Sequence, residues 1–548
     1  MTFSRGWWIA LLLAPAAVLA DGSARAGEPA GLPHGVRLLP SGRYAQDLCD
    51  HDQRFYCMAH RILPASYRPG DSIEEGLRLH PLVGQGAGPP DIQSAYGLTG
   101  SSGGKIVAIL NQPDSSALND VNTYRAQYGI PALAVCGGSG LPTGSGTPCF
   151  ASVDENGGSV NQNIGDSGMS DGETGLDMDM ISAACPDCSI LLVQFQQPGD
   201  SDFTTGAATA ARLGASATSI SWGGPEQGDP APPSAVFTTS GHLVLAASGD
   251  AGWDLSLMGG NTPSYPASAP DILGVGGTTL SGPGSEVVWN DGSQGGAGGS
   301  GCSTEFPMPA FQTAFGASNF GSCTLRDSVD VSAAAETTIN GGGIAEYSAA
   351  TGGWALVVGT SAASPMVAAI FTRLGLTDAI SADLGFVYKN MSAFNDITSG
   401  SNGSCGNIQC TAGTGWDGPT GVGTPNGAKL VLLGSSSGSS GGSGSSSGSS
   451  SGGSSGSSGG SGSGSGGGSG GSGSSGGGSG GSGSSGGGFP FNGSSGGGDG
   501  GANSDSLSPG STSGCGCGTV GSSTAALDGL AFLAIGGVAT AFARRRRR

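Results

Sequence analysis

The chain has 548 residues, of which 110 are glycine, and its formal net charge is −20. A nucleic-acid-binding protein needs a basic surface, and the whole sequence contains only three lysines, so its composition argues against that class. An excess of carboxylates suits a protein that works in acid, because partial protonation relieves their mutual repulsion. Glycine and serine are concentrated in residues 434–514, a linker too poor in apolar residues to form a core. The remainder is long enough for one large globular domain.

The first 26 residues have the pattern of a signal peptide. Arg5 precedes an apolar run from Trp7 to Ala20, and Ala24-Arg25-Ala26 offers a small-residue cleavage site. The run is shorter than the roughly 20 residues that a transmembrane helix needs. We therefore expect export, with cleavage after Ala26 or Ala20. Residues 27–89, which hold four of the five histidines, are expected to be a short pro-segment or an N-terminal extension.

Between residues 90 and 433, short apolar runs alternate with helix-like segments. The runs are apolar on both faces, which is typical of parallel strands that are covered on both sides. This pattern predicts an α/β domain with a doubly wound, mostly parallel sheet and helices on both faces. Strands are expected at 105–110, 189–195, 217–222 and 242–247, and helices at 202–214 and 361–374.

The run from Gly359 to Pro365, Gly-Thr-Ser-Ala-Ala-Ser-Pro, indicates chemistry more clearly than any other segment. A strand-like stretch at 355–358 precedes it, and a helix with Pro365 in its first turn is expected to follow. The hydroxyl of Ser361 would then lie at a helix N-terminus, where backbone N–H groups can stabilise an oxyanion. Serine and threonine are also common N-caps, so this pattern alone does not distinguish a nucleophile from a cap.

A serine nucleophile needs a base. His242 is the only histidine between residues 90 and 433, but it opens an apolar strand, which favours a structural role. Glu173 and Asp177 are four residues apart and would share one face of a helix. Two close carboxylates cannot both ionise cheaply, so one can accept the serine proton while the other orients it. The alternative is a capping box that begins at Ser170.

Asp250 lies in Ser248-Gly-Asp250, directly after a buried apolar strand. Open α/β sheets place their sites at such strand ends. If Asp250 is buried and protonated, its carboxyl group can donate a hydrogen bond to an oxyanion. Taken by itself, the residue also fits an ordinary turn aspartate.

Together these segments resemble the sedolisin family of serine-carboxyl peptidases. The resemblance implies a subtilisin-like fold, with Ser361 as the nucleophile, Glu173 as its general base, Asp177 as the support of Glu173, and Asp250 in the oxyanion hole. A carboxylate base implies a low pH optimum. Three further segments in the same order strengthen the resemblance: Tyr265-Pro-Ala-Ser268, Val275-Gly-Gly-Thr278 and Asp330-Val-Ser332.

A calcium site is expected near the end of the domain. Asp396 and Asp417, together with a glycine-rich run, supply oxygen ligands of the kind that Ca²⁺ prefers. The resemblance implies one structural Ca²⁺ bound by these two carboxylates and by the carbonyl oxygens of Ile397, Gly413 and Gly415. The spacing does not match an EF-hand loop, and a turn-rich loop without an ion is the alternative.

The sequence departs from the sedolisin pattern in two respects. The family usually carries a much longer folded pro-region, and Asn111 stands where many relatives have aspartate. Two other functions stay open: a catalytically inactive, peptidase-like binding module on a surface stalk, and a neutral-pH peptidase with a Ser-His-Asp triad. The second lacks a suitable histidine motif.

Ten of the twelve cysteines lie between the signal peptide and the C-terminal tail. Cys185-Pro-Asp-Cys188 could be a redox motif or half of a zinc site, but no second pair or nearby histidine completes such a site, and export favours oxidation of the cysteines. We therefore expect disulfides between neighbours in sequence. The expected pairs are Cys49/Cys57, Cys136/Cys149, Cys185/Cys188, Cys302/Cys323 and Cys405/Cys410.

Residues 515–548 resemble the MYXO-CTERM sorting tail of myxobacterial surface proteins. Cys515 comes first, an apolar stretch interrupted by Asp528 follows, and Arg544–Arg548 ends the chain. The resemblance implies cleavage of the tail and modification of the cysteine for anchoring, and the alternative is a plain membrane span. We expect a monomer held at the cell surface or outer membrane, or released to the medium, that acts on protein or peptide substrates.

Overall fold

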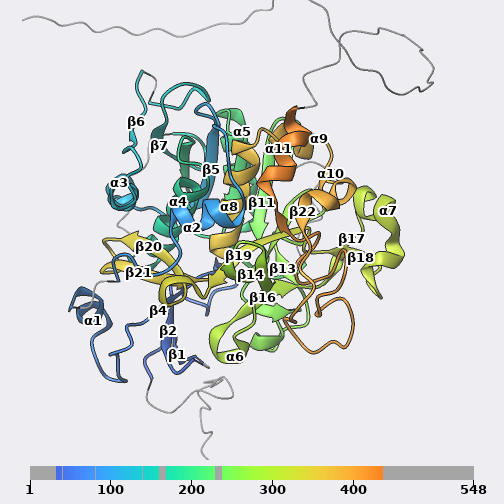
Figure 1. Cartoon of the computed structure of the whole chain (residues 1–548), viewed down its shortest axis with the longest axis horizontal. Helices are drawn as coiled ribbons and strands as arrows, with labels where there is room; N and C mark the ends of the chain where they lie inside the picture. The colour runs from blue at the N-terminus through green and yellow to red at the C-terminus, as the bar shows by residue number, and fades with distance from the viewer. Residues whose placement is uncertain are drawn as a thin grey trace, which may run out of the picture. The chain divides into compact units, whose positions relative to one another are not determined.

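A twisted, mostly parallel sheet runs through the centre of the domain, with helices packed on both of its faces (Figure 1). The computed structural model describes residues 32–39, 41–79, 82–138, 140–158, 168–228 and 237–435. The predicted signal peptide, nearly all of the Gly/Ser-rich linker and the C-terminal tail lie outside these residues.

The central sheet contains nine strands among the described residues. Its order is β15 (Ser285–Val288), β14 (Leu273–Gly282), β11 (Leu243–Ala247), β9 (Ala217–Ile220), β5 (Ile106–Asn111), β8 (Ser189–Gln194), β7 (Cys149–Asp154) and β6 (Ala134–Val135), with β19 (Val331–Thr337) paired to β14. Apart from the antiparallel pairing of β14 with β15, these pairs are parallel. The predicted strands are confirmed, and β5, β8, β9 and β11 are buried along their whole length, as their apolar runs require.

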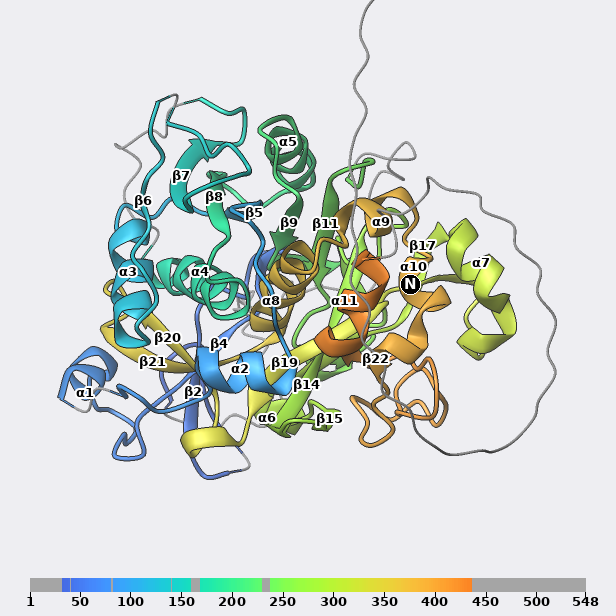
Figure 2. The same ribbon diagram turned by 45° about the horizontal axis from the view of Figure 1, so that its top comes forward.

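Helices α4 and α8 pack against each other, and α8 lies across β9, β11 and β14 (Figure 2). Helix α5 covers the opposite face of the sheet. It contacts Leu110 of β5, whereas α8 contacts Ser219 of β9. The register of these two parallel strands places the side chains of Leu110 and Ser219 on opposite faces. The helices are α1 (Ile73–Leu79), α2 (Pro89–Ala95), α3 (Ala117–Gln127), α4 (Asp171–Ala184), α5 (Asp200–Arg212), α6 (Gly292–Gly295), α7 (Ala310–Gly316), α8 (Thr360–Arg373), α9 (Thr377–Ala382), α10 (Phe386–Lys389) and α11 (Gly427–Ser435).

A second, antiparallel sheet joins the N-terminal segment to the rest of the domain. Its order is β1 (Val36–Leu38), β2 (Tyr44–Asp47), β4 (His60–Ile62), β21 (Gly353–Val358) and β20 (Ile344–Ser348). The strand predicted just before Ser361 therefore exists, but it belongs to this sheet. In Figure 1 the blue N-terminal strands lie beside the yellow β20 and β21.

Smaller strand pairs and five disulfides complete the described structure. A three-stranded sheet consists of β13 (Ser264–Tyr265), β10 (Trp222–Pro225) and β3 (Tyr56–Cys57), and the two-stranded pairs are β12 (Ala251–Trp253) with β16 (Ala297–Ser300), β17 (Cys302–Pro307) with β18 (Leu325–Asp327), and β22 (Phe394–Asn395) with β23 (Thr424–Pro425). All five predicted disulfides are confirmed. No helix within the described residues is long and apolar enough to cross a membrane.

Candidate active site

Ser361 lies in the first turn of α8, at the carboxyl ends of the central parallel strands, and its side chain is completely buried. Its hydroxyl donates to the carbonyl oxygen of Ser221 at 3.2 Å and accepts from the N–H of Met58 at 3.1 Å. Gly359 precedes the helix with φ +147°, and an added Cβ would lie only 2.2 Å from the carbonyl oxygen of Met58. Only glycine allows the backbone to approach so closely here.

Glu173 and Asp177 project from α4, which packs directly on α8, and both are fully buried. Asp177 accepts hydrogen bonds from the Ser221 hydroxyl at 2.6 Å and from Asn111 Nδ2 at 3.0 Å. Burial raises the pKa of Asp177 well above its ordinary value, although these two bonds act in the opposite direction. The predicted shared face of the helix thus brings both carboxylates to the serine.

Glu173 is the more isolated of the two carboxylates. Both of its oxygens are buried and have no hydrogen-bond partner among the described residues, because Ser361 directs its hydroxyl to Ser221 instead. Burial, followed by the charge of Asp177, raises the pKa of Glu173 well above its ordinary value, while the nearby Ser361 hydroxyl lowers it. A buried carboxylate beside a serine hydroxyl and without another partner is well placed to exchange a proton with it.

Asp250 follows β11, as predicted, and contacts the first residue of α8. Its Oδ1 accepts from both the N–H and the hydroxyl of Thr360 at 2.8 Å. Its Oδ2 lies 3.2 Å from Nε2 of His60 and would lie 2.7 Å from a Cβ at Gly359. The structure therefore gathers Ser361, Glu173, Asp177 and Asp250 around the N-terminus of α8.

His242 has a different environment. Its Nδ1 lies 2.8 Å from the carbonyl oxygen of Ala215, and its Nε2 lies 3.2 Å from the Thr218 hydroxyl. Burial lowers its pKa. These contacts agree with the structural role that the sequence favours for this histidine.

The role of Asn111 in the site did not emerge from sequence reasoning, which noted this residue only as a departure from the family. Its Oδ1 accepts from the indole N–H of Trp222 at 3.0 Å, which fixes the amide so that Nδ2 faces Asp177. The positions of these residues in the sequence could have revealed this role. Asn111 ends β5 and Ser221 follows β9, and the carboxyl ends of adjacent parallel strands lie at the same edge of a sheet.

An ion-paired cluster from the N-terminal segment lies next to Asp250. Asp47, His51 and His60 bring one ligand atom each to within 4.8 Å of one another, a spacing that could suit a metal ion. The guanidinium of Arg37, however, lies 2.7 Å from Asp47 Oδ1 and already supplies a cation. Burial acts to raise the pKa of Asp47, but Arg37, His60 and His51 together hold it well below its ordinary value.

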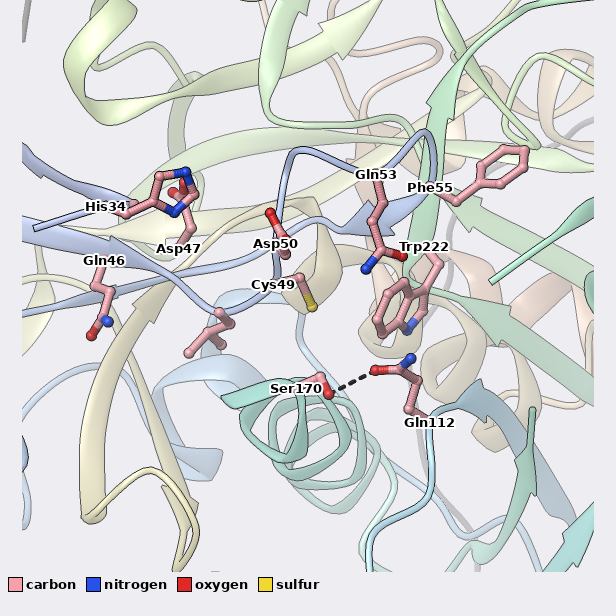
Figure 3. Close-up of a pocket in the computed structure, with 12 residues that line it drawn as sticks. His34, Gln46, Asp47, Cys49, Asp50, Gln53, Phe55, Gln112, Ser170 and Trp222 are labelled. Carbon is pink, nitrogen blue, oxygen red and sulfur yellow. Dashed lines mark hydrogen bonds between the residues drawn. The ribbon is translucent and has the colours of Figure 1, made fainter. Parts of the chain in front are cut away.

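A cavity of about 440 Å³ lies between the N-terminal segment and the loops beside α4 and β10 (Figure 3). Residues of the loop from Leu48 to Phe55 form one wall, and Gln112, Ser170 and Trp222 form the other. Figure 3 shows the Ser170 hydroxyl donating to the side-chain oxygen of Gln112, at 2.8 Å. Ser170 directly precedes α4, which carries Glu173 and Asp177, and Trp222 begins β10.

The predicted calcium ligands lie in one loop region. The N–H of Gly413 donates to Asp417 Oδ2 at 3.0 Å, and the N–H of Gly415 donates to Asp396 Oδ2 at 3.0 Å. Asp417 is buried, and burial raises its pKa to about 7, with a smaller contribution from the charge of Asp396. The two carboxylates are thus close enough to repel each other, and Ile397 lies buried beside Asp396.

Residues 158–376 match the family model described as the subtilase family. The chain is 31% identical to kumamolisin from Bacillus sp. (strain MN-32) over 382 residues, which cover 64% of each protein. It is 33% identical to sedolisin from Pseudomonas sp. (strain 101) over 229 residues, which cover 37% of each protein.

A solved structure of Pseudomonas sedolisin complexed with two molecules of pseudo-iodotyrostatin matches 65% of this chain and 99% of its own, with a TM-score of 0.51 and 24% identity. The subtilisin-like α/β fold is thereby confirmed. The chain is thus similar in sequence to sedolisin-type serine peptidases over part of its length. The aligned region spans less than two thirds of the length of kumamolisin.

Proposed function

We propose that this chain is a serine-carboxyl endopeptidase that hydrolyses proteins or peptides in acid. One observation carries the proposal: the buried hydroxyl of Ser361, at the N-terminus of α8, lies beside Glu173 of α4, while Asp250 binds the neighbouring Thr360. The sequence similarity to kumamolisin and sedolisin points to the same chemistry.

In the proposed mechanism, the Ser361 hydroxyl turns from Ser221 toward Glu173 and attacks the substrate carbonyl while Glu173 accepts its proton. Asp177, fixed by Ser221 and Asn111, orients Glu173 and disfavours a second charge beside it. The N–H of Ser361 and a protonated Asp250 receive the oxyanion. Glu173 then returns the proton to the leaving amine, and water hydrolyses the resulting acyl-enzyme.

Acid action follows from the groups that carry the protons. Asp250 must hold its proton to donate to the oxyanion, and Glu173 must be ionised in part of the molecules to act as a base. Burial raises the pKa of both Glu173 and Asp177, and two neighbouring carboxyl groups lose their protons one after the other, so Glu173 can be ionised while Asp177 keeps its proton.

Hydrolysis of casein at about pH 4 and at about pH 8 tests the proposal. We expect cleavage at the acidic pH. Cleavage at the alkaline pH alone would contradict a carboxylate base and favour a Ser-His-Asp peptidase. The absence of cleavage at both values, in a chain whose N-terminal segment has been removed, would favour an inactive binding module.

We also propose one structural Ca²⁺, held by Asp396, Asp417 and three backbone carbonyl oxygens. Among the described residues, the carbonyl oxygens of Ile397, Gly413 and Gly415 accept no hydrogen bond, which leaves them available as ligands. Asp417 is buried beside a second carboxylate, and a divalent cation would offset both the cost of burying its charge and the repulsion between the two groups. The residues therefore fit the ion.

Chelation with EDTA is expected to lower the unfolding temperature, because an ion that binds only the folded protein stabilises it by mass action. Asp417→Ala is expected to unfold at a similarly low temperature and to respond little to EDTA. The measurement is thermal unfolding followed by circular dichroism, with and without added calcium. An Asp417→Ala protein that still gains stability from calcium would show that the ion binds elsewhere.

We further propose export and attachment to the cell surface through the C-terminal tail. The tail and the linker lie outside the described residues, so their sequence carries this proposal. Truncation before Cys515 is expected to release active enzyme into the medium, since a Gly/Ser-rich linker contributes no core. Mass spectrometry of the envelope-bound protein tests for processing: retention of Arg544–Arg548 would exclude cleavage and indicate a plain membrane span.

A further inference from the structure

The backbone of Asp250 is held by a hairpin that residues 289–298 form. The N–H of Ala297 in this hairpin donates to the carbonyl oxygen of Asp250 at 2.9 Å, beside the parallel pairing of β16 with β12. The two arms of the hairpin are joined by an antiparallel bridge and by a hydrogen bond from the N–H of Asp291 to the carbonyl oxygen of Gly296, at 2.8 Å. A shift of this hairpin is therefore transmitted to the backbone of Asp250.

The start of α8 is held by β19. The N–H of Gly359, two residues before the nucleophile, donates to the carbonyl oxygen of Ala335 at 2.8 Å. Glu336, the next residue of β19, has its carboxyl group hydrogen-bonded to that of Asp291. The Asp291–Glu336 pair thus joins the hairpin that holds Asp250 to the strand that holds Gly359.

Trp289 connects the pair to the packing around the first residue of α8. Its ring is fully buried in one apolar cluster with Ala335, and its indole N–H donates to Asp291 Oδ2 at 3.4 Å. An added Cβ at Gly277 would lie 3.2 Å from this ring and 3.1 Å from the methyl group of Thr360. The ring and Thr360, whose N–H and hydroxyl bind the Asp250 carboxyl group, therefore border the same glycine.

We propose that the Asp291–Glu336 pair is an acid-dependent clamp that positions Asp250 at the start of α8, so that the oxyanion site is assembled in acid and loses its alignment near neutral pH. Both are positioning residues, because they act through the backbone contacts of Ala297 and Ala335. The proposal rests on the proposed peptidase function, which gives Asp250 its part in the reaction.

The pair can share one proton. Burial, followed by the charge of Asp291, raises the pKa of Glu336 to about 7, while the hydroxyl of Thr279, which donates to Glu336 Oε2 at 2.8 Å, lowers it. Burial also raises the pKa of Asp291, against its hydrogen bonds with Trp289 and Glu336. Below about pH 7 at least one proton therefore joins the two groups, whereas above it both are ionised and repel each other.

Both carboxyl groups of the pair are partly exposed on the wall of a cavity of about 250 Å³, so their protons can exchange with water. Among the described residues that line this cavity, Arg43 is the only other charged one. Its Nη1 donates to the carbonyl oxygen of Gly341 at 3.1 Å, and its Nη2 to that of Leu63 at 3.4 Å. Because these nitrogens bind backbone oxygens, the second negative charge of the pair has no ion partner among the residues of the cavity.

Hydrogen–deuterium exchange tests the clamp without relying on activity. In the full chain carrying Ser361→Ala, exchange of the peptide that contains Ala297 is followed by mass spectrometry and corrected for the intrinsic effect of pH. We expect protection of this peptide to fall about tenfold or more from about pH 5 to about pH 8. Glu336→Gln keeps a donor beside Asp291 at both pH values and should keep the protection constant. A peptide from β5 reports global opening in the same samples.

Peptide hydrolysis tests the effect on catalysis, with all proteins compared at the same N-terminus. Glu336→Gln should move the alkaline limb of kcat upward by about 0.5 pH unit or more, with little change in KM, because the clamp aligns a group that acts on the transition state. Glu336→Ala, which has no donor, should lose kcat by about tenfold or more even at about pH 4. Glu155→Gln, at the end of β7, should follow the wild type. Circular dichroism checks that each variant folds.

The outcomes separate this proposal from the function on which it rests. If the wild type hydrolyses the peptide in acid and Glu336→Gln has an unmoved alkaline limb, the clamp is wrong and the peptidase function stands. An equal loss of protection in Glu336→Gln and its parent overturns the clamp as well. If the wild type hydrolyses no peptide, the proposed function fails, and the role of the clamp in catalysis fails with it.

Discussion

Ser361→Ala is expected to abolish peptide hydrolysis, and Glu173→Gln to reduce it about a thousandfold or more, because nucleophile and base act as one unit. The amide of glutamine is close in shape to the carboxylate but cannot take the serine proton. Both side chains are fully buried, so a water molecule from the solvent cannot easily reach Ser361 and accept its proton in place of Glu173. The measurement is kcat/KM on casein-derived peptides at about pH 4.

The comparison must separate lost chemistry from a difference in the N-terminus of the assayed protein. Each variant is therefore compared with a wild-type chain that has the same N-terminus, which is determined by sequencing before the assay. Glu155→Gln, a change on the partly exposed side chain at the end of β7, is the matched control and should leave kcat/KM near the wild-type value. Wild-type activity in Glu173→Gln would exclude Glu173 as the base, even if Ser361→Ala is inactive.

The protein is expected to lose stability as the pH rises from about 4.5 to about 8, and Glu346 is expected to be a major cause. This residue of β20 is fully buried, and neither of its carboxylate oxygens has a hydrogen-bond partner among the described residues. Burial raises its pKa from 4.5 to about 8, although Arg61 acts in the opposite direction.

The sign follows from the two states. In the unfolded chain Glu346 ionises near its ordinary pKa, whereas in the folded protein it keeps its proton until about pH 8. Between these pH values ionisation of Glu346 stabilises the unfolded chain but not the folded protein. The free energy of unfolding therefore falls as the pH rises. Below this window both states are protonated, and the penalty disappears.

Glu346→Gln removes the ionisable group and keeps the shape of the side chain. Each pKa unit corresponds to about 1.4 kcal/mol, so the variant is expected to be more stable than its parent by a few kcal/mol at about pH 8 and nearly equal at about pH 4. Urea unfolding at both pH values measures this, in a Ser361→Ala background that prevents self-digestion. The exposed Glu75→Gln is the control. An equal loss of stability with pH in all three proteins would contradict the prediction.

The sequence by itself determined the features that depend on neighbours along the chain. The apolar runs of β5, β8, β9 and β11 predicted a buried parallel sheet because such strands must be covered on both faces. The spacing of Glu173 and Asp177 predicted a shared helix face, since residues four apart in a helix are neighbours. The five disulfides join cysteines separated by at most 21 residues, and all were predicted as local pairs.

Only the tertiary structure decided how distant segments meet. Met58 and Ser361 are 303 residues apart, and nothing in the local pattern of either one predicts their contact. The strand before Ser361 was predicted, but its partners in the N-terminal segment were not, because any extended segment offers similar backbone donors and acceptors. The pairing of the N-terminal segment with the domain depends on side chains that make contacts on both sides of the bond between Met58 and its successor. Met58 packs against the glycines of its pocket, and His60 lies beside Asp250. Such complementarity arises only after the chain has folded, when the groove that receives the segment exists.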